Sequence, residues 1–466
     1  MADCSSQPTL AIIGGGLAGL AAACALSESG FSVTVFERRP YLGGRASSYE
    51  HPGTGEVVDN CQHVLFGSCT NLIAFYRDIG ILEKIRWFDR MTFVEPGGRQ
   101  SILEPTFLPA PFHVTPSFLR FRFLSTRDKF ALSSALTSLM LGAPKDDGLS
   151  FQDWLIQHRQ TPAAIERFWK PILVSALSED LDRISIPYAA QVVRESMKAP
   201  IARRMGIPTV PLTHLYDAAS TYITARGGSV RLRSGVHSIP PLDSGFRVRT
   251  QDNEEYFDYG VLAVPFDAAG QLVSDLPGCA VLTERISHFT TSPITGVHLW
   301  FDRQISDLPH AVLLDRTIQW MFHKSILLAS RATTEDGPSY VELVVSSSKS
   351  LINKSRQEII DLALRELREF LPAAREANLV KATVIKEVNA TFSPTPGIDY
   401  YRPSSVTPRP RLFLAGDWTA TGWPATMEGA VRSGYLAAEA LTKNAGSPKS
   451  FLVPDLPPAG LMRLFG

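Results

Sequence analysis

The start of the chain alternates between apolar runs that fit buried strands and a stretch that fits a tightly packed helix. Residues 10–13 form a continuous apolar run, as a buried parallel strand does. Residues 17–26 are small and apolar and predict a helix packed closely on a sheet, and residues 31–36 predict a second strand. Glycines interrupt the apolar stretch 10–26, so it does not fit a membrane span, which needs about 20 apolar residues.

Patterns farther along the chain predict a second set of strands and helices. Residues 227–236, 246–250 and 259–264 fit a β-meander whose last, apolar strand returns to the first sheet. Residues 411–415 predict an apolar strand that ends at a Gly-Asp turn, and a helix is expected to begin near Thr426. This helix has a face of small residues that can pack closely on a sheet: Ala430, Gly434, Ala437, Ala438 and Leu441.

The two remaining stretches predict a different mixture of elements. Residues 81–204 are expected to be mostly helical. Residues 276–394 are expected to hold strands around 296–301 and 340–346 and an amphipathic helix at 356–370. These elements together predict an α/β fold with a discontinuous Rossmann-type nucleotide domain and an inserted α+β substrate domain. The expected boundaries are 1–80, 205–275 and 395–445 for the nucleotide domain, 81–204 and 276–394 for the substrate domain, and 446–466 for a C-terminal tail.

A glycine-rich turn joins the first strand to the first helix. Gly14, Gly16 and Gly19 follow the pattern GxGxxG. The first glycine makes a tight turn, the second lets the backbone approach a pyrophosphate, and the third allows close packing of helix on strand. The helix N-terminus offers free N–H groups and a partial positive charge to phosphates. Glu37 follows the second strand, where a carboxylate can accept hydrogen bonds from both ribose hydroxyls. The turn therefore predicts a dinucleotide site.

Composition narrows the class of protein. The chain has 466 residues, of which 44% are hydrophobic and 20% charged, as in an ordinary soluble enzyme. Its 46 basic and 46 acidic residues balance, so no overall positive field exists to hold nucleic acid. The five cysteines form no CxxC pair, which argues for a reducing compartment and against a structural zinc site or any other metal centre. The first residues lack the basic region of a secretory signal, so a cytoplasmic protein is expected.

The segment after Glu37 resembles the extension found in the FAD-containing amine oxidase and phytoene desaturase superfamily. It reads Glu-Arg-Arg-Pro-Tyr-Leu-Gly-Gly-Arg over residues 37–45. The resemblance implies that FAD is the cofactor, with residues 43–45 over the pyrophosphate and the backbone of Val236 against adenine. It also implies that Asp417 binds the ribityl chain or phosphate and that the Met427 N–H meets the flavin pyrimidine edge. The implied cofactor-binding residues are Gly14, Gly16, Leu17, Ala18, Gly19, Glu37, Arg38, Gly43, Gly44, Arg45, Gln62, His63, Val236, Gly416, Asp417, Met427 and Ala430.

Within this superfamily, further runs resemble the hydroxysqualene dehydroxylase group, also described as squalene-associated FAD-dependent desaturases. The matching runs are residues 59–63, 108–113, 165–171, 294–303, 391–397 and 412–440. Two positions depart from the group pattern: Cys61 stands where glycine is usual, and Ser178 where asparagine is more frequent. Carotenoid desaturases, which also act on long polyenes, are the alternative, and a lipid-binding flavoprotein without catalysis is a third.

Amine oxidases are similar in the nucleotide segments but differ at two places. They typically carry a lysine near the flavin and an aromatic residue just before the Met-Glu-Gly sequence. Those places hold Gly296 and Thr426 here, so an amine substrate has no evident site.

The resemblance implies reductive removal of an allylic hydroxyl, which converts hydroxysqualene to squalene in squalene and hopanoid biosynthesis. Loss of water to an allylic cation and hydride delivery from reduced FAD would need an acid near the carbinol and a dry tunnel. His63 is the first candidate acid, oriented by Asp59 with Gln62 beside it; the alternative is that this segment supplies only backbone contacts. His298 is expected to be a hydrogen-bonded sheet histidine. No second GxGxxG is present, so the electron donor stays unidentified.

One segment combines aromatic and basic residues. Residues 107–141 hold four basic residues and Asp128 as the sole acid, among several phenylalanines and leucines. Such a segment fits either a face that docks on a membrane surface, at the inner side of the cytoplasmic membrane, or a lid or core helix whose phenylalanines point inward. The end of the chain, residues 461–466, is expected to be frayed, with a small added contact to such a face as the alternative.

Overall fold

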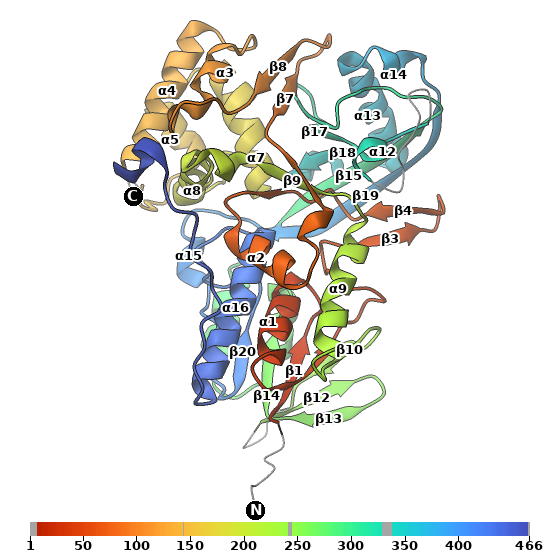
Figure 1. Ribbon diagram of the computed structural model, residues 1–466, viewed down its shortest axis with the longest axis vertical. Coiled ribbons are helices and arrows are strands. Elements are labelled where there is room, and N and C mark those ends of the chain that lie inside the picture. The colour runs from red at the N-terminus through yellow and green to blue at the C-terminus, as the bar shows by residue number, and fades with distance from the viewer. Residues whose placement is uncertain (1–6, 143, 241–244, 329–337, 465–466) are drawn as a thin grey trace, which may run out of the picture.

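The computed structural model describes residues 7–142, 144–240, 245–328 and 338–464. The molecule has two domains: a nucleotide domain at one end and, at the other, a domain built on a larger sheet with helices (Figure 1). Among the described residues, no helix is both long enough and apolar enough to cross a membrane. The four described cysteines are free, and Cys4 lies outside the described residues.

A parallel sheet of five strands forms the nucleotide domain, in the order β10-β2-β1-β14-β20. Its strands are β1 (Thr9–Ile13), β2 (Ser32–Phe36), β10 (Ser229–Arg231), β14 (Tyr259–Leu262) and β20 (Leu412–Leu414). β1 is central because its residues 10–13 are apolar and buried on both faces. The strands predicted at 10–13, 31–36, 259–264 and 411–415 are therefore confirmed, and distant parts of the chain complete one sheet.

Three helices lie side by side over one face of this sheet (Figure 1). They are α16 (Met427–Asn444), α1 (Leu17–Ser27) and α9 (Leu212–Thr224). Every residue of α1 is buried, because the helix is enclosed by the sheet and by its two neighbours. The predicted small-residue face of α16 is confirmed: Gly434 lies against Ala18 and Ala21 of α1.

The predicted meander is correct only in part: of its expected strands, residues 246–250 lie in an antiparallel sheet of three strands, whereas residues 229–231 pair in parallel with β2 in the nucleotide sheet. The antiparallel sheet consists of β11 (Val236–Ser238), β12 (Phe246–Thr250) and β13 (Glu254–Phe257). α10 (Phe266–Val273) and α11 (Ala280–Ser287) follow β14.

The second domain is built on a sheet of seven strands in the order β19-β15-β18-β17-β16-β7-β8. The strands are β7 (Met91–Val94), β8 (Gln100–Leu103), β15 (Thr291–Phe301), β16 (His310–Leu313), β17 (Trp320–His323), β18 (Ser339–Ser346) and β19 (Leu379–Phe392). α13 (Arg356–Phe370) spans the predicted residues and packs its apolar side on one face, against Val297, Leu299 and Phe301 of β15. The alternate residues of β15, Gly296 and His298, face the other way.

The prediction that residues 81–204 are mostly helical is correct only in part. β7 and β8 lie in this stretch and extend the large sheet, and β6 (Ile85–Phe88) lies in a sheet of three with β5 (Leu65–Phe66) and β9 (Met205–Pro208). β6, β7 and β8 are only four residues long, and β7 pairs with β16, more than 200 residues away, so no local pattern revealed them. The helical elements of this stretch are η1 (Leu82–Lys84), η2 (Phe112–Val114), α3 (Thr115–Leu119), α4 (Thr126–Leu141), α5 (Phe151–Gln157), α6 (Pro162–Ala164), the π-helical turn η3 (Ile165–Trp169), α7 (Lys170–Leu177), α8 (Ile186–Met197) and η4 (Pro200–Arg203).

The remaining described elements before the C-terminal tail are short. They are the hairpin of β3 (Ser48–His51) and β4 (Glu56–Asp59), α2 (Thr70–Asp78), α12 (Lys324–Leu327), η6 (Lys349–Leu351), α14 (Ala373–Glu376) and α15 (Ile398–Tyr401). The residue boundaries of the two domains stay predictions.

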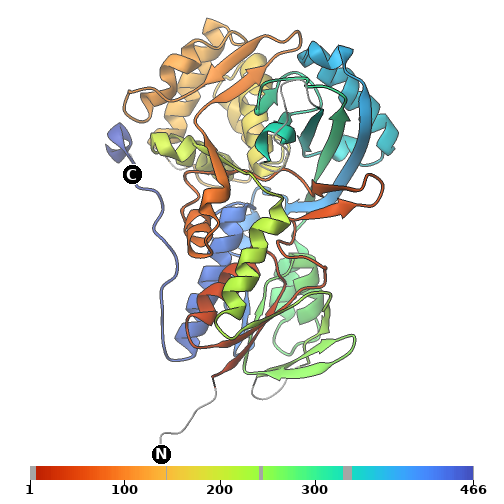
Figure 2. The same cartoon turned by 45° about the vertical axis from the view of Figure 1, so that its right-hand side comes forward.

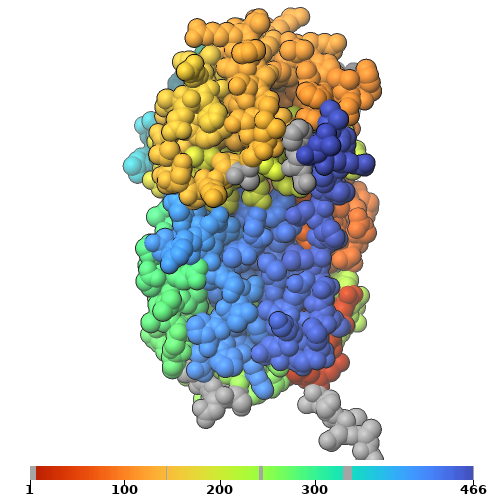
Figure 3. Space-filling view, turned by 90° about the vertical axis from the view of Figure 1, so that its left-hand side faces the viewer, coloured from red at the N-terminus to blue at the C-terminus, as the bar shows by residue number. Residues whose placement is uncertain are grey.

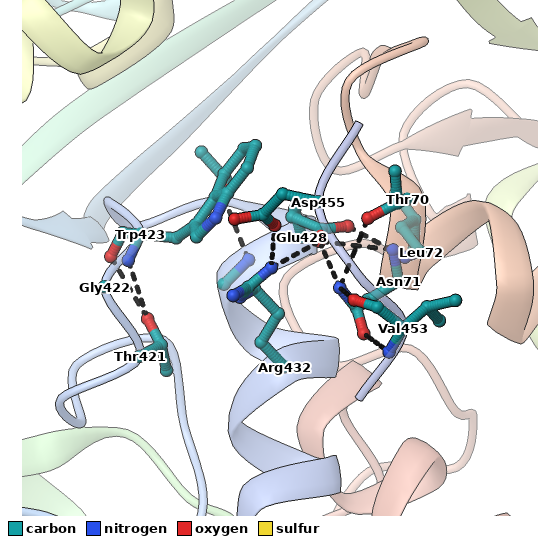
Figure 4. Close-up of polar contacts among 12 residues, drawn as sticks. Thr70, Asn71, Leu72, Thr421, Gly422, Trp423, Glu428, Arg432, Val453 and Asp455 are labelled. Carbon is teal, nitrogen blue, oxygen red and sulfur yellow. Dashed lines mark hydrogen bonds and ion pairs between the residues drawn. The ribbon is translucent and has the colours of Figure 1, made fainter. Parts of the chain in front are cut away.

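The described part of the C-terminal tail is fixed rather than frayed. After α16 it runs along the outside of the molecule to η7 (Gly460–Leu464) (Figure 2). Figure 4 shows its anchor: Val453 exchanges hydrogen bonds with the side chain of Asn71, and Asp455 pairs with Arg432 at 2.6 Å. Buried Glu428 completes this anchor by accepting a hydrogen bond from the Leu72 amide at 2.8 Å. The expectation of a frayed end is therefore wrong for residues 461–464, and residues 465–466 lie outside the described part.

The substitution Gly434→Ala tests the contact between α16 and α1. A Cβ at this position would lie 2.3 Å from the Ala18 carbonyl oxygen, which belongs to a buried helix and cannot turn aside. We expect the free energy of unfolding to fall by about 1–3 kcal/mol, measured by chemical denaturation. Gly142→Ala is the matched control, because nothing lies within 4 Å of its Cβ position. Equal stability of the two variants would contradict the close packing.

Candidate functional site

The glycine-rich turn lies at the carboxyl end of β1 and begins the candidate nucleotide site. Gly14 has φ +113°, and a Cβ there would lie 2.4 Å from the Ala263 carbonyl oxygen. A Cβ at Gly19 would lie 2.0 Å from the Gly14 carbonyl oxygen, so both positions require glycine. Gly16 differs, because the nearest atom to its Cβ position is 3.8 Å away. Since no side chain caps α1, the backbone at Gly16 and the first amides of the helix, at Leu17 and Ala18, are available to phosphate oxygens.

Glu37 is buried at the end of β2 and is held by the backbone. One carboxylate oxygen accepts a hydrogen bond from the Gly15 amide at 2.8 Å and the other from the Arg39 amide at 2.7 Å. The Ser234 amide donates to the Glu37 carbonyl, which brings the turn before Val236 alongside. The carboxylate is thus oriented at the position where a ribose is expected. The Arg38 side chain is exposed at the edge of this site.

The glycine pair and Arg45 lie between the first turn and the end of β20. Gly43 bridges to Gly16, and its amide donates to the Gly15 carbonyl at 2.9 Å. The Arg45 guanidinium donates to an Asp417 carboxylate oxygen at 2.7 Å. The structure therefore joins residues 43–45 to the Gly-Asp turn, more than 370 residues away in sequence.

The Gly-Asp turn itself is tightly enclosed. Gly416 has φ +147°, its amide donates to Ser433 Oγ at 2.8 Å, and a Cβ there would lie 2.3 Å from Trp418 Nε1. Buried Arg402 donates to the Asp417 carbonyl at 2.9 Å. Arg45 thus holds the side chain of Asp417, and Arg402 holds its backbone.

The N-terminus of α16 provides a second set of free amides. The Thr426 side chain accepts from the Gly429 amide at 3.1 Å, which leaves the first amides, at Met427 and Glu428, without an intrahelical acceptor. The Glu428 carboxylate points away toward Asn71 and Leu72 of α2 (Figure 4), so it holds the helix and does not face a ligand. Ala430 is half-buried one turn further along.

These segments fit an extended dinucleotide. The amides of α1, the carboxylate of Glu37 and the backbone before Val236 suit an ADP half, and Asp417 with the start of α16 suits the remaining half. All lie at the carboxyl ends of the parallel strands, where ligands bind in open α/β sheets.

A buried charge cluster lies where the segment after β4 meets the large sheet. Lys324 Nζ donates to Asp59 Oδ2 at 2.6 Å and to Gln62 Oε1 at 2.7 Å. Glu342 of β18 lies 3.5 Å from the same Nζ and accepts from the Gln62 amide at 2.5 Å. Asp59 also accepts from the Leu212 amide at the start of α9. The cluster holds residues 59–62 against both domains.

The charges of this cluster follow from burial and pairing. Burial acts to raise the pKa of Asp59, but the adjacent Lys324 ammonium outweighs it and lowers that pKa below 3.8. Burial raises the pKa of Glu342 to about 7, since Lys324 is shared with Asp59. At neutral pH the ion pair of Asp59 and Lys324 therefore sits beside a carboxyl group that titrates.

His63 and Asp59 do not form the predicted pair. His63 Nδ1 donates to the Cys61 carbonyl at 2.7 Å, and burial lowers the pKa of the ring. In this tautomer Nε2 carries no proton, so His63 can accept a proton but has none to donate there. The expectation that Asp59 orients His63 is therefore corrected, since Asp59 orients Lys324 instead, and the acid role of His63 stays a prediction. Gln62 donates to the His63 carbonyl at 2.9 Å, so Gln62 does lie beside it.

Lys324 and Glu342 were missed by the sequence reasoning. Lys324 interrupts an apolar stretch, residues 320–328, and Glu342 stands among apolar residues of a buried strand. A single charge in such a run was the available signal. The Gly296 position lies beside this cluster, since a Cβ there would lie 3.8 Å from Glu342 Oε1, and Glu342 in turn lies 3.5 Å from Lys324 Nζ. This lysine is bound by Asp59 and is not a free amine.

Four buried imidazoles of the described residues have unfilled hydrogen-bonding capacity: His113, His298, His310 and His323. His298 Nδ1 pairs with the Tyr340 hydroxyl at 2.8 Å, but Nε2 lacks a partner among the described residues, and burial lowers the ring pKa to about 3. The expectation of a satisfied sheet histidine is therefore half correct. Neither nitrogen of His113 has a partner there, and Arg203 Nη1 is likewise buried without one. Burial lowers the pKa of Arg203 to about 10. Within the described residues, no group of three or more His, Cys, Asp or Glu could hold a metal ion.

The titration of Glu342 predicts a pH-dependent stability. Its carboxyl group holds a proton more tightly in the folded chain (pKa about 7) than in the unfolded chain (4.5). The free energy of unfolding should therefore fall as pH rises from 4.5 to 7 and level off above, by on the order of 3 kcal/mol. In Glu342→Gln this decrease should be absent, as measured by denaturation at pH 5, 6, 7 and 8. Glu376→Gln, at an exposed position, serves as the control. If the free energy of unfolding had the same pH dependence in wild type and in Glu342→Gln, the raised pKa of Glu342 would be refuted.

Known proteins with the same fold were found by structure comparison. An oxidoreductase from Methanosarcina mazei matches with a TM-score of 0.71 at 19% identity and covers 93% of this chain and 100% of its own. A putrescine oxidase with bound putrescine matches with a TM-score of 0.69 at 19% identity, over 94% of this chain and 98% of its own. At this identity the likeness shows the fold: a two-domain, amine-oxidase-like architecture.

Curated relatives match over almost their whole length. The 15-cis-phytoene desaturase of Synechococcus elongatus is 26% identical over 93% of this chain and 95% of its own. The zeta-carotene desaturase of a Synechocystis species is 27% identical over 93% of this chain and 97% of its own. The model of flavin containing amine oxidoreductases matches residues 17–442. The chain therefore belongs to the flavin containing amine oxidoreductase family, and it is an FAD-dependent oxidoreductase.

Proposed function

We propose that the protein transfers hydride between FAD and a long isoprenoid chain. The observation that carries this proposal is the full-length similarity to two carotenoid desaturases, which includes the substrate domain as well as the nucleotide domain. The absence of the amine-oxidase residues at Gly296 and Thr426 supports it, as does the engagement of Lys324 by Asp59. When bound, FAD supplies a hydride acceptor in its oxidised form and a hydride donor in its reduced form.

Desaturation of a carotenoid-type polyene is the first candidate reaction. The substrate loses a hydride to oxidised FAD and a proton to a base, and a new C=C bond forms between the two carbons. The printed names of the relatives favour this reaction. The geometry of His63 also favours it, because Nδ1 donates to the Cys61 carbonyl and a neutral ring in this tautomer would accept a proton at Nε2.

Reductive dehydroxylation of hydroxysqualene is the second candidate reaction. The allylic C–O bond breaks, the hydroxyl group leaves as water with one added proton, and hydride from reduced FAD bonds to the carbon, which gives squalene. The runs that resemble the hydroxysqualene dehydroxylase group favour this reaction. It requires a proton donor, and Glu342 is a carboxyl group that is partly protonated at neutral pH, behind Gln62. The physiological electron donor is not part of either proposal.

An anaerobic experiment with two arms tests the proposal. In one arm the protein is reduced and mixed with hydroxysqualene; in the other the oxidised protein is mixed with phytoene. Flavin absorbance near 450 nm is followed and the products are extracted. Reoxidation with stoichiometric squalene would establish dehydroxylation, and bleaching with new conjugated absorbance would establish desaturation.

The same experiment can contradict both reactions. If hydroxysqualene and phytoene each bind to the protein but neither changes the redox state of the flavin, the protein is a lipid-binding flavoprotein without this catalysis. Release of peroxide when amines are added in air would show instead that the protein oxidises amines.

The substitution Arg45→Met tests the cofactor site apart from catalysis. It leaves the Asp417 carboxylate without its charged partner and removes a positive charge next to the expected pyrophosphate. We expect the dissociation constant for FAD to rise by about 10- to 100-fold, as a lost charge-assisted contact would cause. Titration of the apoprotein with FAD measures it, and the unfolding temperature of the apoprotein verifies folding. Arg303→Met, at an exposed position outside the site, should leave the affinity unchanged.

A further inference from the structure

We propose that residues 107–130 and η7 together form a docking surface for an anionic lipid bilayer. Hereafter this surface is called the docking face. The inference holds for either reaction above, because it depends on the outside of the molecule and not on the flavin site. It also joins two segments whose near ends, residues 130 and 460, lie 330 positions apart in sequence.

Large apolar side chains project from the docking face. Phe107 is 96% exposed, Phe130 79% and Leu464 77%. The remaining exposed apolar side chains of the face are Phe112, Leu119 and Leu461. Single exposed leucines are common on protein surfaces, but phenylalanines exposed to this extent, several in one segment, are not. Aromatic and leucine side chains of this kind insert at the boundary between lipid head groups and acyl chains.

Positive charge surrounds these side chains. Arg120, Arg122 and Arg127 are exposed within the first segment, and Arg463 is exposed in η7. The one acid of residues 107–141, Asp128, is buried and accepts from Ser125 and Thr161, so it does not offset the surface charge. Lys129 adds a further cation, which donates to the Leu119 carbonyl at 2.7 Å. The charge of the face is thus complementary to anionic head groups, and this complementarity selects the occupant.

The exposed residues are held outward by their neighbours in the chain. Phe118, Phe121, Phe123 and Leu124 are buried in the core of the second domain, and Phe121 stacks on Phe123 with ring centroids 4.7 Å apart. The prediction that phenylalanines of this segment point inward is therefore correct for these residues. The phenylalanines at positions 107, 112 and 130 are exposed, and the alternative prediction of a membrane-facing surface applies to them. Because the inward residues fix the backbone, the exposed ones cannot fold back to cover themselves.

η7 lies beside this segment. The Leu461 amide donates to the Ala110 carbonyl at 2.8 Å, and Met462 is buried in the contact. Figure 3 shows η7 in dark blue on the same side of the molecule as part of the orange segment. The contacts of Val453 with Asn71 and of Asp455 with Arg432 hold the tail before η7 against the molecule, so that η7 lies beside Ala110. The tail therefore contributes Leu461, Arg463 and Leu464 to the face.

Sedimentation with vesicles tests the docking face. The FAD-loaded protein is mixed with vesicles of phosphatidylcholine alone or with added phosphatidylglycerol. We expect binding to the anionic vesicles and a decrease in affinity of roughly fivefold for each arginine changed to glutamine at positions 120, 122 and 127. Binding should weaken with added salt. The double variant Phe107→Ser/Phe130→Ser and, separately, Leu464→Ser should lower binding to the same vesicles.

A matched variant removes exposed apolar side chains elsewhere. Val281 is 70% exposed on α11 and Tyr400 79% exposed on α15, both outside the docking face. Val281→Ser/Tyr400→Ser should bind anionic vesicles as wild type does, and flavin absorbance and unfolding temperature report folding for every variant. Equal binding of all variants, or no binding by wild type, would overturn the proposal. A concentration-dependent dimer that Phe107→Ser/Phe130→Ser abolishes, without vesicle binding, would show instead that a second copy covers this face.

Discussion

The ion pair between Asp59 and Lys324 is the contact through which the two domains define a common site. Its two side chains are almost fully buried, and their atoms approach to 2.6 Å. Removing one partner of such a pair typically costs about 3–5 kcal/mol, because the other charge remains buried and uncompensated. Asp59 also receives the first amide of α9, and Lys324 also holds the Gln62 side chain. The nucleotide domain, the large sheet and the segment expected to pass the flavin are therefore positioned by one set of charges.

This arrangement explains which features the sequence could reveal. The turn at Gly14, the strand at residues 10–13 and the helix at Arg356–Phe370 depend on near neighbours, so glycine spacing and apolar periodicity predicted them. The cluster of Lys324 and Glu342 depends on a partner some 265 residues away, and no periodicity encodes such a distance. The same reason applies to β7, whose pairing with β16 crosses from one insertion to the other. The orientation of His63 was equally hidden, since it follows from a hydrogen bond to a carbonyl.

The candidate site has one part that suits a dinucleotide cofactor and a second part on the large sheet, around Gly296 and His298 of β15. Glycines, Glu37 and the free amides of α1 and α16 recognise a dinucleotide and contain nothing that selects a substrate. The face of the large sheet that carries Gly296 and His298 lies near Asn60 and Glu342, and Gly296 stands where amine oxidases typically carry a lysine. The putrescine oxidase shares the fold at 19% identity and the phytoene desaturase is 26% identical in sequence, each over more than nine-tenths of this chain. The shared fold therefore does not by itself distinguish the substrates of these proteins.

The place of β20 in the nucleotide sheet has a consequence for how the protein is made. β1 leaves the ribosome about 400 residues before β20 and α16, which span residues 412–444. Until they emerge, β14 has an unpaired edge and α1 lacks the helix that covers it. The nucleotide domain can therefore close only after both substrate-domain insertions have been translated. A nascent chain truncated before residue 412 should accordingly fail to retain FAD.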